Sequence, residues 1–271
     1  MVLSTDTIYC VHGYNNSHTK KQDMGWQARK LMPLRKQIPI FFLMSLLGGK
    51  ETLNYTINFW GITCVDVEMI LEEKEQNNMK LDFLAKTTNV VDYFFPVNNK
   101  YTTWYDKQLF TMSKYIVSTD QPNANYNYEL TWNKKTKQYT TSLLSYSRLE
   151  KNHNIFSLLM RARNMQWQQL DTIWWPVEHD GTPYQGRYLW VDSLEISVGT
   201  EKILADHFRL DLQEIEGDSQ QINEISDVFS WGITLKDCIR QVWVERSGKR
   251  RILQAEVTVK GINLIAKLIN Y

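Results

Sequence analysis

Thr52-Leu53-Asn54-Tyr55-Thr56-Ile57-Asn58-Phe59 is the stretch that decides the fold. Apolar and polar residues alternate throughout it, so an extended chain would present one apolar face and one hydrated face. Gly61 interrupts the alternation, which resumes from Thr63 to Leu71 and, after the polar stretch 72–78, from Met79 to Ala85. Three consecutive segments of period two predict neighbouring strands of an antiparallel meander.

Segments of similar character extend to the end of the chain. The predicted strands are Tyr101–Tyr105, Phe110–Val117, Tyr126–Trp132, Gln138–Leu144, Leu189–Val198, Lys202–Ile215, Val228–Leu235, Ile239–Glu245 and Ile252–Val259. The last residues, 262–271, are predicted as a strand or a short helix. No repeat of fixed period and no low-complexity linker divides this region.

Turns and one helix complete the prediction. Trp174-Trp175-Pro176 is expected to end a segment, and Asp180-Gly181 and Gln185-Gly186 carry the residues of turns. Asn154–Met165 has apolar residues at helical spacing, and Asn154 can cap its first turn. The sequence therefore predicts a mainly β domain with a helix packed on its sheet.

Composition bounds the class of protein. The 271 residues are 43% hydrophobic and 23% charged, which suits one large core over 50–271. The net charge of +1 provides no field to attract nucleic acid, so no nucleic-acid partner is expected. Three cysteines, Cys10, Cys64 and Cys238, show no metal-ligand spacing. A Cys64–Cys238 disulfide is an alternative to the favoured free thiols.

Residues 1–49 are predicted to be a leader. Within 32–49, a positive start around Arg35 and Lys36 precedes an apolar run from Ile38 to Leu47 and then two glycines, which is the layout of a signal peptide. The run is shorter than the roughly 20 residues that span a bilayer. Export would make Met24 or Met32 the initiator and would place the protein in the periplasm or cell envelope. The alternative is an N-terminal helix in a cytoplasmic protein.

Three groups of residues carry a resemblance. Glu51-Thr52-Leu53-Asn54-Tyr55 continues to Phe59-Trp60-Gly61-Ile62; Asn154-Ile155-Phe156-Ser157-Leu158-Leu159 ends in Arg161 and Arg163; Val242-Trp243-Val244 leads to Arg250-Arg251 and a strand before Gly261. In this order they resemble the bacterial domain of unknown function 3108 family, a group of exported proteins, over nearly all of 49–271. Lys50 departs from the family pattern.

The resemblance implies a fold and a location. The implied fold is an antiparallel sheet curled into an incomplete, half-open barrel with one or two short helices packed on it, similar to lipoprotein carriers of the bacterial envelope. It implies no activity and no site residue. A concave apolar face is the kind of surface on which small hydrophobic ligands bind.

No residue pattern specifies a reaction, a cofactor or a metal. Glu178-His179-Asp180 could serve acid–base or metal chemistry, but a solvated turn is the favoured interpretation. His153, His207 and the two histidines before residue 49 lack a second ligand at metal spacing. No Gly-x-Ser-x-Gly elbow and no phosphate-binding glycine loop occurs. We therefore expect a protein that is not an enzyme.

The sequence still offers candidate residues for binding a ligand. Arg161 and Arg163 could bind an anionic head group. The aromatic group comprises Trp167, Trp174, Trp175, Tyr184, Tyr188 and Trp190. Trp174, Trp175, Tyr188 and Trp190 could line the mouth of a cavity, although aromatic residues in a sheet usually belong to the core. The predicted ligand-binding site therefore comprises Arg161, Arg163, Trp174, Trp175, Tyr188 and Trp190.

Three classes of function remain open. A binding or carrier protein, for a lipid or another apolar small molecule, predicts a concave apolar cavity. An envelope assembly protein, with a protein partner, predicts an exposed strand edge or apolar patch. An enzyme predicts a cleft with convergent titratable groups, for which only Glu178, His179 and Arg163 are candidates.

Overall fold

The computed structural model describes residues 49–270 except 218, 221 and 224, and the predicted leader lies outside them apart from Gly49. These residues form one 14-stranded antiparallel sheet in the order β8-β7-β6-β5-β4-β3-β2-β1-β14-β13-β12-β11-β10-β9. The first eight strands are β1 (Lys50–Phe59), β2 (Ile62–Lys74), β3 (Asn78–Thr87), β4 (Asn98–Asp106), β5 (Met112–Gln121), β6 (Ala124–Asn133), β7 (Gln138–Thr140) and β8 (Ser145–Ser147). The others are β9 (Trp174–His179), β10 (Thr182–Val198), β11 (Glu201–Glu214), β12 (Ile239–Glu245), β13 (Ile252–Val259) and β14 (Ile262–Asn270).

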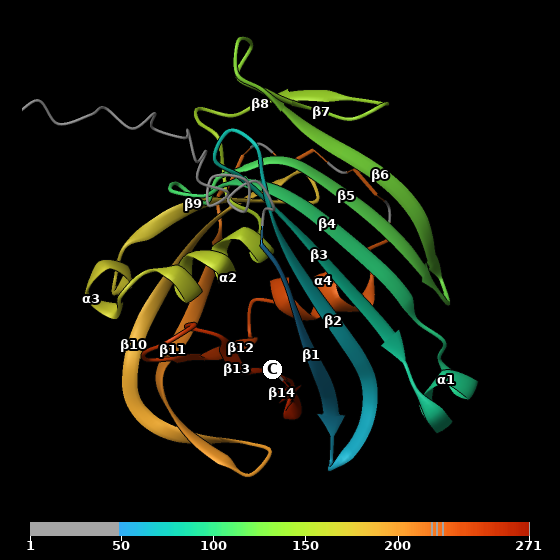
Figure 1. Cartoon of the computed structure of the whole chain (residues 1–271). Helices are drawn as coiled ribbons and strands as arrows, with labels where there is room; N and C mark the ends of the chain where they lie inside the picture. The colour runs from blue at the N-terminus through green and yellow to red at the C-terminus, as the bar shows by residue number, and fades with distance from the viewer. Residues whose placement is uncertain (1–48, 218, 221, 224, 271) are drawn as a thin grey trace, which may run out of the picture. The chain divides into compact units, whose positions relative to one another are not determined.

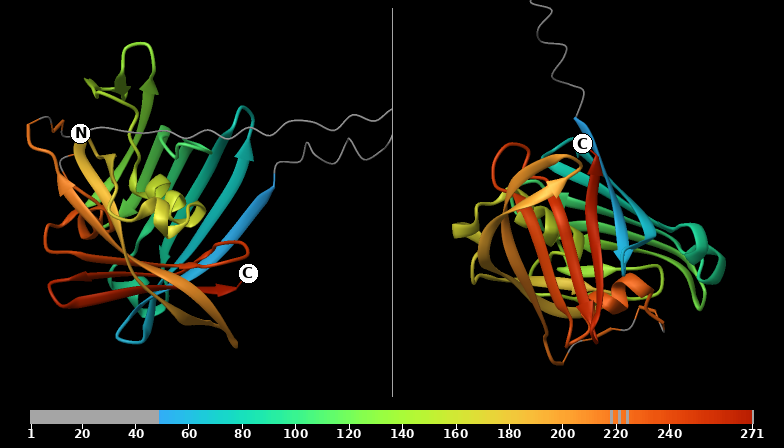
Figure 2. Two further views of the ribbon diagram at one scale, coloured as in Figure 1. Left: turned by 90° about the vertical axis from the view of Figure 1, so that its left-hand side faces the viewer. Right: turned by 90° about the horizontal axis from the view of Figure 1, so that it is seen from below.

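The sheet curls around its core without closing (Figures 1 and 2), because the terminal strands β8 and β9 do not pair with each other. The first and last strands in the sequence, β1 and β14, pair inside the sheet, with Asn58 opposite Ile265. The predicted fold class, a mainly β half-open barrel with short helices, is confirmed. Along β1 the buried residues Leu53 and Tyr55 belong to the apolar face, as the alternation predicted.

Four short helices accompany the sheet: α1 (Asn89–Phe94), α2 (Ile155–Asn164), α3 (Trp167–Leu170) and α4 (Val228–Thr234). Helix α2 lies inside the curl of the sheet (Figure 1). Asn154 caps it as predicted, since its side chain accepts a hydrogen bond from the Ser157 amide at 2.9 Å. Leu158 and Met160 of α2 are fully buried. None of the helices within the described ranges is long and apolar enough to span a bilayer.

Gly186 corrects one prediction, because Gln185-Gly186 lies inside the long strand β10 and makes no turn. A Cβ atom at Gly186 would lie 2.9 Å from Leu158 Cδ2 and 3.1 Å from Leu212 Cδ2. Glycine is therefore used here for the close approach of α2 to the sheet. The Asp180-Gly181 turn is confirmed, with φ values of 50° and 88°.

Three further predictions need correction. Val228–Leu235 is a helix, α4, because Asp227 accepts hydrogen bonds from the amides of Phe229 and Ser230 and starts it. Trp174-Trp175-Pro176 begins strand β9, where Pro176 is tolerated at a sheet edge. The predicted strand Gln138–Leu144 ends at Thr140. Residues 262–270 are a strand.

Both edges of the sheet are protected against pairing with other chains. Strand β8 is only three residues long. Along β9, the His153 amide donates to Pro176 O at 2.9 Å and the Glu178 amide donates to His153 O at 2.7 Å. The segment before α2 thus covers part of this edge, which is one of the ways in which proteins avoid edge-to-edge association.

Cys64 and Cys238 are free thiols in the structure, so the alternative of a disulfide between them is not supported. Cys238 is buried and Cys64 is half-buried. Burial raises the pKa of the Cys238 thiol, which keeps it in the unreactive protonated form.

Candidate ligand cavity

An apolar cavity of about 190 Å³ lies on the concave face of the sheet, between the sheet, α2 and α4. The sheet contributes mainly aliphatic side chains, among them Ile57, Val67, Met69, Val242, Ile252 and Leu264. Helix α2 contributes Ile155, Phe156 and Leu159, and α4 contributes Val228, Phe229, Gly232 and Ile233. A cavity with such walls favours an apolar occupant.

The polar side chains at the cavity are already engaged. Tyr55 donates its hydroxyl hydrogen to Ile252 O at 3.0 Å, and burial raises its pKa. Arg240 donates to Ile233 O, to Leu235 O at 2.7 Å and to Cys238 O at 2.9 Å. Both side chains are thus bonded to the protein's own backbone.

Gln241 and Glu256 adjoin the cavity through their backbone. They are paired across β12 and β13, directly beside the pair Val242 and Ala255, whose side chains line the cavity. Successive side chains on a strand point to opposite faces, so those of Gln241 and Glu256 point to the convex face. In agreement, Gln241 Oε1 lies 2.9 Å from Nε2 of His207. Among the lining residues, Arg240 is therefore the one charged side chain on the face that lines the cavity.

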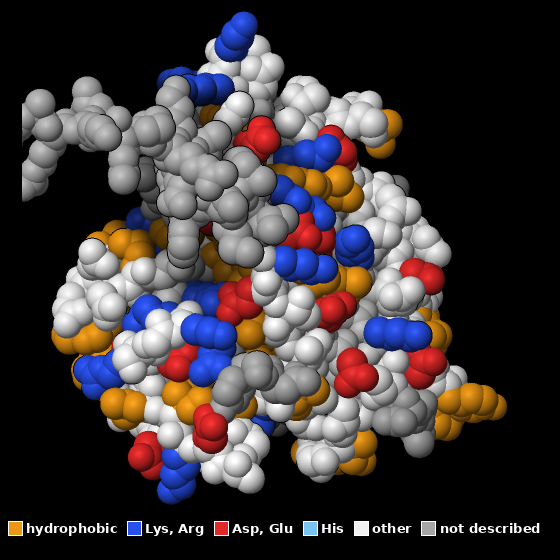
Figure 3. Space-filling view, viewed as in Figure 1, with side chains coloured by type: hydrophobic (Ala, Val, Ile, Leu, Met, Phe, Trp, Pro, Cys, Tyr) orange, Lys and Arg blue, Asp and Glu red, His pale blue; other side chains and the backbone are white. Residues whose placement is uncertain are grey.

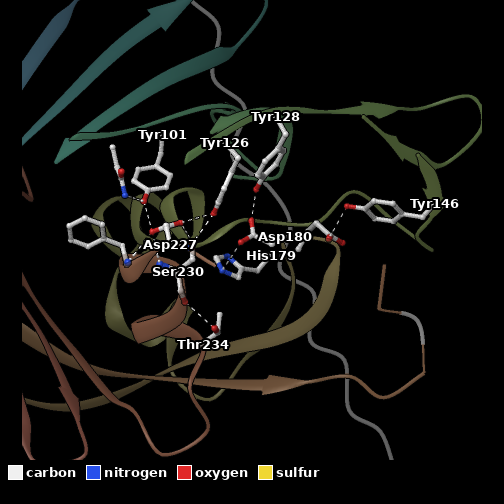
Figure 4. A network of polar contacts seen from close by, with 12 residues as sticks. Tyr101, Tyr126, Tyr128, Tyr146, His179, Asp180, Asp227, Ser230 and Thr234 are labelled. Atoms are coloured by element: carbon white, nitrogen blue, oxygen red, sulfur yellow. Dashed lines mark hydrogen bonds and ion pairs between the residues drawn. The ribbon is translucent and has the colours of Figure 1, made fainter. Parts of the chain in front are cut away.

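Helix α4 is attached to the sheet at its N-cap, Asp227. Asp227, which is 0% exposed, accepts from the hydroxyl of Tyr101 at 2.6 Å and from that of Tyr126 at 3.3 Å (Figure 4). Ser230 Oγ donates to the same carboxylate at 2.7 Å. Burial, and then the negative charge of Asp227, raise the pKa of Tyr101, which keeps its proton in the hydrogen bond. Strands β4 and β6 thus hold the start of α4.

The other end of α4 is held by Arg240. Its guanidinium donates to the carbonyls of Ile233 in the last turn, of Leu235 at the C-cap and of Cys238 in the segment that follows the helix. A cation at a helix C-terminus satisfies free carbonyls and opposes the helix dipole. One wall of the cavity is therefore a seven-residue helix with polar contacts at its two ends and with Phe229 and Ile233 packed against the core.

The two predicted arginines serve the protein's own backbone. Arg161 donates to Leu109 O at 2.8 Å and lies over the ring of Trp175 at 4.7 Å. Arg163 donates to Arg250 O at 3.1 Å and to Lys249 O at 3.2 Å, and pairs with Glu51 at 2.7 Å. Neither residue lines the cavity.

The four predicted aromatic residues are also outside the cavity lining. Tyr188 is fully buried and donates to Leu158 O at 3.1 Å. Trp175 is in the core, and Trp174 is half-exposed beneath Arg187. Trp190 stacks on Trp167 with ring centroids 4.8 Å apart. These six residues support the fold around α2 and α3 and do not converge on one site.

Glu178-His179-Asp180 is not the solvated turn that was expected. Glu178 is 1% exposed; it accepts from Arg148 Nε at 2.7 Å and from the Tyr146 hydroxyl at 2.9 Å. Asp180 accepts from Tyr128 (Figure 4), and His179 is buried beside it. Within the described residues, no group of three or more His, Cys, Asp or Glu side chains is placed to hold a metal ion.

The cavity residues carried no signal that sequence reasoning could use. Ile57, Val67 and Met69 alternate as core residues do, and α4 was predicted as a strand. A second hollow of about 260 Å³ lies beside α1. Its lining is mixed in charge and polarity: Lys86, Asp92, Pro96, Val97, Asn98, Asp120, Gln121 and Pro122. This hollow has no convergent set of groups comparable with the apolar cavity.

Comparisons with known proteins identify no family for this chain. No family model and no curated protein matches the chain, so the resemblance to the domain of unknown function 3108 family stays a prediction. Among solved structures, the chain is similar to a beta-barrel-like protein of domain of unknown function DUF1849 from Brucella abortus, with a TM-score of 0.49, 8% identity, and coverage of 83% of this chain and 97% of the other.

A second solved structure is the hypothetical lipoprotein YmcC from Escherichia coli (K12), with a TM-score of 0.29, 8% identity, and coverage of 87% of this chain and 90% of the other. Likenesses as remote as these two do not bear on function. The described part of the chain is a β-rich, half-open barrel with an apolar cavity under a short helix.

Proposed function

We propose that this domain binds a small apolar molecule, or one alkyl chain of a lipid, in the cavity beneath α4. The observation that carries the proposal is the cavity itself, whose walls are aliphatic and aromatic and whose polar neighbours Tyr55 and Arg240 are already engaged. Each methylene moved from water into such a site contributes about 0.8 kcal/mol. Binding would therefore depend on shape and apolar area.

The volume of the cavity limits the size of the ligand that can bind. About 190 Å³ is less than the roughly 300–1,000 Å³ of sites for drug-sized molecules. A slim chain suits this space better than a fused-ring compound. Because the walls are mainly apolar, a polar head group would remain outside them.

Titration with a fluorescent alkyl probe tests the proposal. Wild-type protein should bind the probe at one site, and Ala266→Leu should weaken binding about tenfold or more because the larger side chain fills the cavity. Thr258→Leu is the matched control, since Thr258 follows the cavity residue Val257 and points to the other face. Equal probe affinity in all three proteins would contradict the cavity as the binding site. Native mass spectrometry of the purified protein would then identify any retained molecule.

The proposal is for a binding protein that is not an enzyme. Glu178 is paired with Arg148, and Arg163 is paired with Glu51, so two of the three candidate catalytic groups are occupied in separate ion pairs. The assembly alternative has less support, because one sheet edge is short and the other is partly covered.

We propose export to the periplasm or cell envelope on the strength of the signal-like pattern in 32–49. Cell fractionation and intact mass measurement of the expressed protein test this. Recovery from the periplasm without the residues before about Lys50 is expected, whereas a full-length cytoplasmic product would contradict export.

A further inference from the structure

Three apolar tips protrude at one end of the sheet. They are the β1–β2 turn (59–62), the end of α1 (93–95) and the β13–β14 turn (260–262). Trp60 is 86% exposed, Tyr93 84% and Phe94 75%. In the space-filling view, hydrophobic side chains project from the outline of the molecule over α1 (Figure 3). Large apolar side chains that are gathered on an exposed surface mark an interaction site.

Strand pairing sets the tips beside one another. Asn58 of β1 lies opposite Ile265 of β14. Because the two strands are antiparallel, Gly61 and Ile262, each three residues away from that pair, lie at the same level. The Thr88 amide donates to Cys64 O at 3.0 Å, which ties the start of α1 to β2. Viewed from below, the β1–β2 turn lies between α1 and strands β13 and β14 (Figure 2, right).

Trp60 is an unfavourable residue for its position. The turn has φ values of 50° at Trp60 and 81° at Gly61, a left-handed conformation that favours Asn or Asp followed by Gly. A bulky aromatic residue is strained there. Its ring stacks on Phe59, with centroids 4.8 Å apart, and otherwise faces solvent. Folding alone does not account for a tryptophan at this site.

The chemistry of the tips favours a lipid surface. Residues 59–62, 93–95 and 260–262 contain one charged side chain, Lys260, and no acidic one. Tryptophan and tyrosine prefer the boundary between lipid and water, and lysine suits the anionic head groups beside it. A stable protein interface needs a continuous patch of roughly 800 Å² on each partner, which three separate protrusions do not present.

We infer that these three tips dock the protein on a lipid bilayer. The inference rests on the proposed function, because it names the source of the ligand. Ile57 and Leu264, which line the cavity, are two residues before Phe59 and two residues after Ile262. Docking through the tips therefore brings the nearest cavity walls to the membrane, from which an alkyl chain can enter.

Vesicle flotation of the full-length chain tests docking. Vesicles of phosphatidylcholine, alone or mixed with phosphatidylglycerol, should carry the wild-type protein, with stronger binding to the anionic mixture. The combined variant Trp60→Ser, Tyr93→Ser, Phe94→Ser should lose about tenfold or more in partitioning. Leu143→Ser with Leu149→Ser is the control, since these leucines are 89% and 94% exposed near β7 and β8. The control should float like wild type, because the two leucines lie outside the three tips. The segment before residue 49 is the same in each protein, so it does not account for a difference between them.

Other results would overturn the inference. It fails if wild type does not float, if the tip variant floats like wild type, or if the tips instead hold two copies of the chain together in sedimentation without vesicles. Trp60→Asn relieves the turn strain and keeps the test valid if the combined variant does not fold. Ala266→Leu separates the two ideas: it should weaken probe binding about tenfold or more and leave flotation unchanged.

Discussion

Buried arginines fasten the helices of this protein to its sheet. Arg163 donates to Arg250 O at 3.1 Å, and Arg250 donates in return to Arg163 O at 2.7 Å and to Met165 O at 2.7 Å. Arg240 acts in the same way at the end of α4. A guanidinium can serve several carbonyls at once, which lysine cannot do with the same geometry. Arginine therefore replaces the glycine that often ends a helix.

Replacing Arg163 should therefore affect stability. Arg163→Ala leaves the Glu51 carboxylate and two backbone carbonyls without their donor, so we expect the free energy of unfolding to fall by about 2–3 kcal/mol. Urea denaturation measures this loss, and alkyl-probe affinity should stay near the wild-type value. Weaker probe binding at unchanged stability would instead support the head-group role predicted from the sequence.

His153 should make stability depend on pH. Burial, and then the positive charge of Arg161, lower its pKa from 6.5 to about 4. Because the folded pKa lies below the unfolded one, the unfolded chain binds the proton first. The stabilising contribution is complete above pH 6.5 and is lost as the pH falls toward 4.

The size of the effect follows from the pKa difference and is about 3 kcal/mol at most. Comparing the unfolding free energy of wild type and His153→Gln at several pH values isolates it. The difference between the two proteins should shrink as the pH falls from 6.5 toward 4. A difference that does not change over this range would show that His153 is not buried in its neutral form.

At the scale of elements, sequence patterns identified the strands well and the short helices poorly. Alternation is strong in β1 to β3 because one face of each strand is buried. Helix α4 was missed, since Asp227 is held by Tyr101 and Tyr126, far away in the chain. The candidate site was missed for a related reason: a residue that lines a cavity and a residue that fills the core have the same local pattern.

Asp227 should determine how firmly the start of α4 is attached to the sheet. Asp227→Ala removes the N-cap of the helix and the hydrogen-bond acceptor for two tyrosine hydroxyls, so a loss of about 2–4 kcal/mol is expected. Probe association should become faster, because one wall of the cavity is then less firmly attached. Stopped-flow fluorescence measures that rate. Asp120→Ala, at an exposed carboxylate, is the control; if both variants behave alike, Asp227 does not fasten α4.

At the scale of the whole molecule, the β1–β14 pairing joins strands β1–β8 to strands β9–β14 in a single sheet. Buried apolar residues from both groups of strands form one cluster, which includes Tyr115 and Val244. Neither group of strands can exclude water from its concave apolar face without the other. We therefore expect one cooperative unfolding transition.

Hydrogen exchange under native conditions checks this expectation. The amides of Tyr115 in β5 and Val244 in β12 should open with the same free energy, within about 0.5 kcal/mol, because both should exchange only through global unfolding. Two clearly separate values would show that the two groups of strands unfold independently.

The central position of β1 and β14 also has a consequence for synthesis on the ribosome. Strand β1 is made first, yet its partner on one side, β14, is the last strand of the sheet to be made. Until then β1 presents an unpaired edge, and the nascent chain exposes an apolar face. The growing polypeptide is therefore a natural client for chaperones, and its final strand closes the fold only after translation has passed β14.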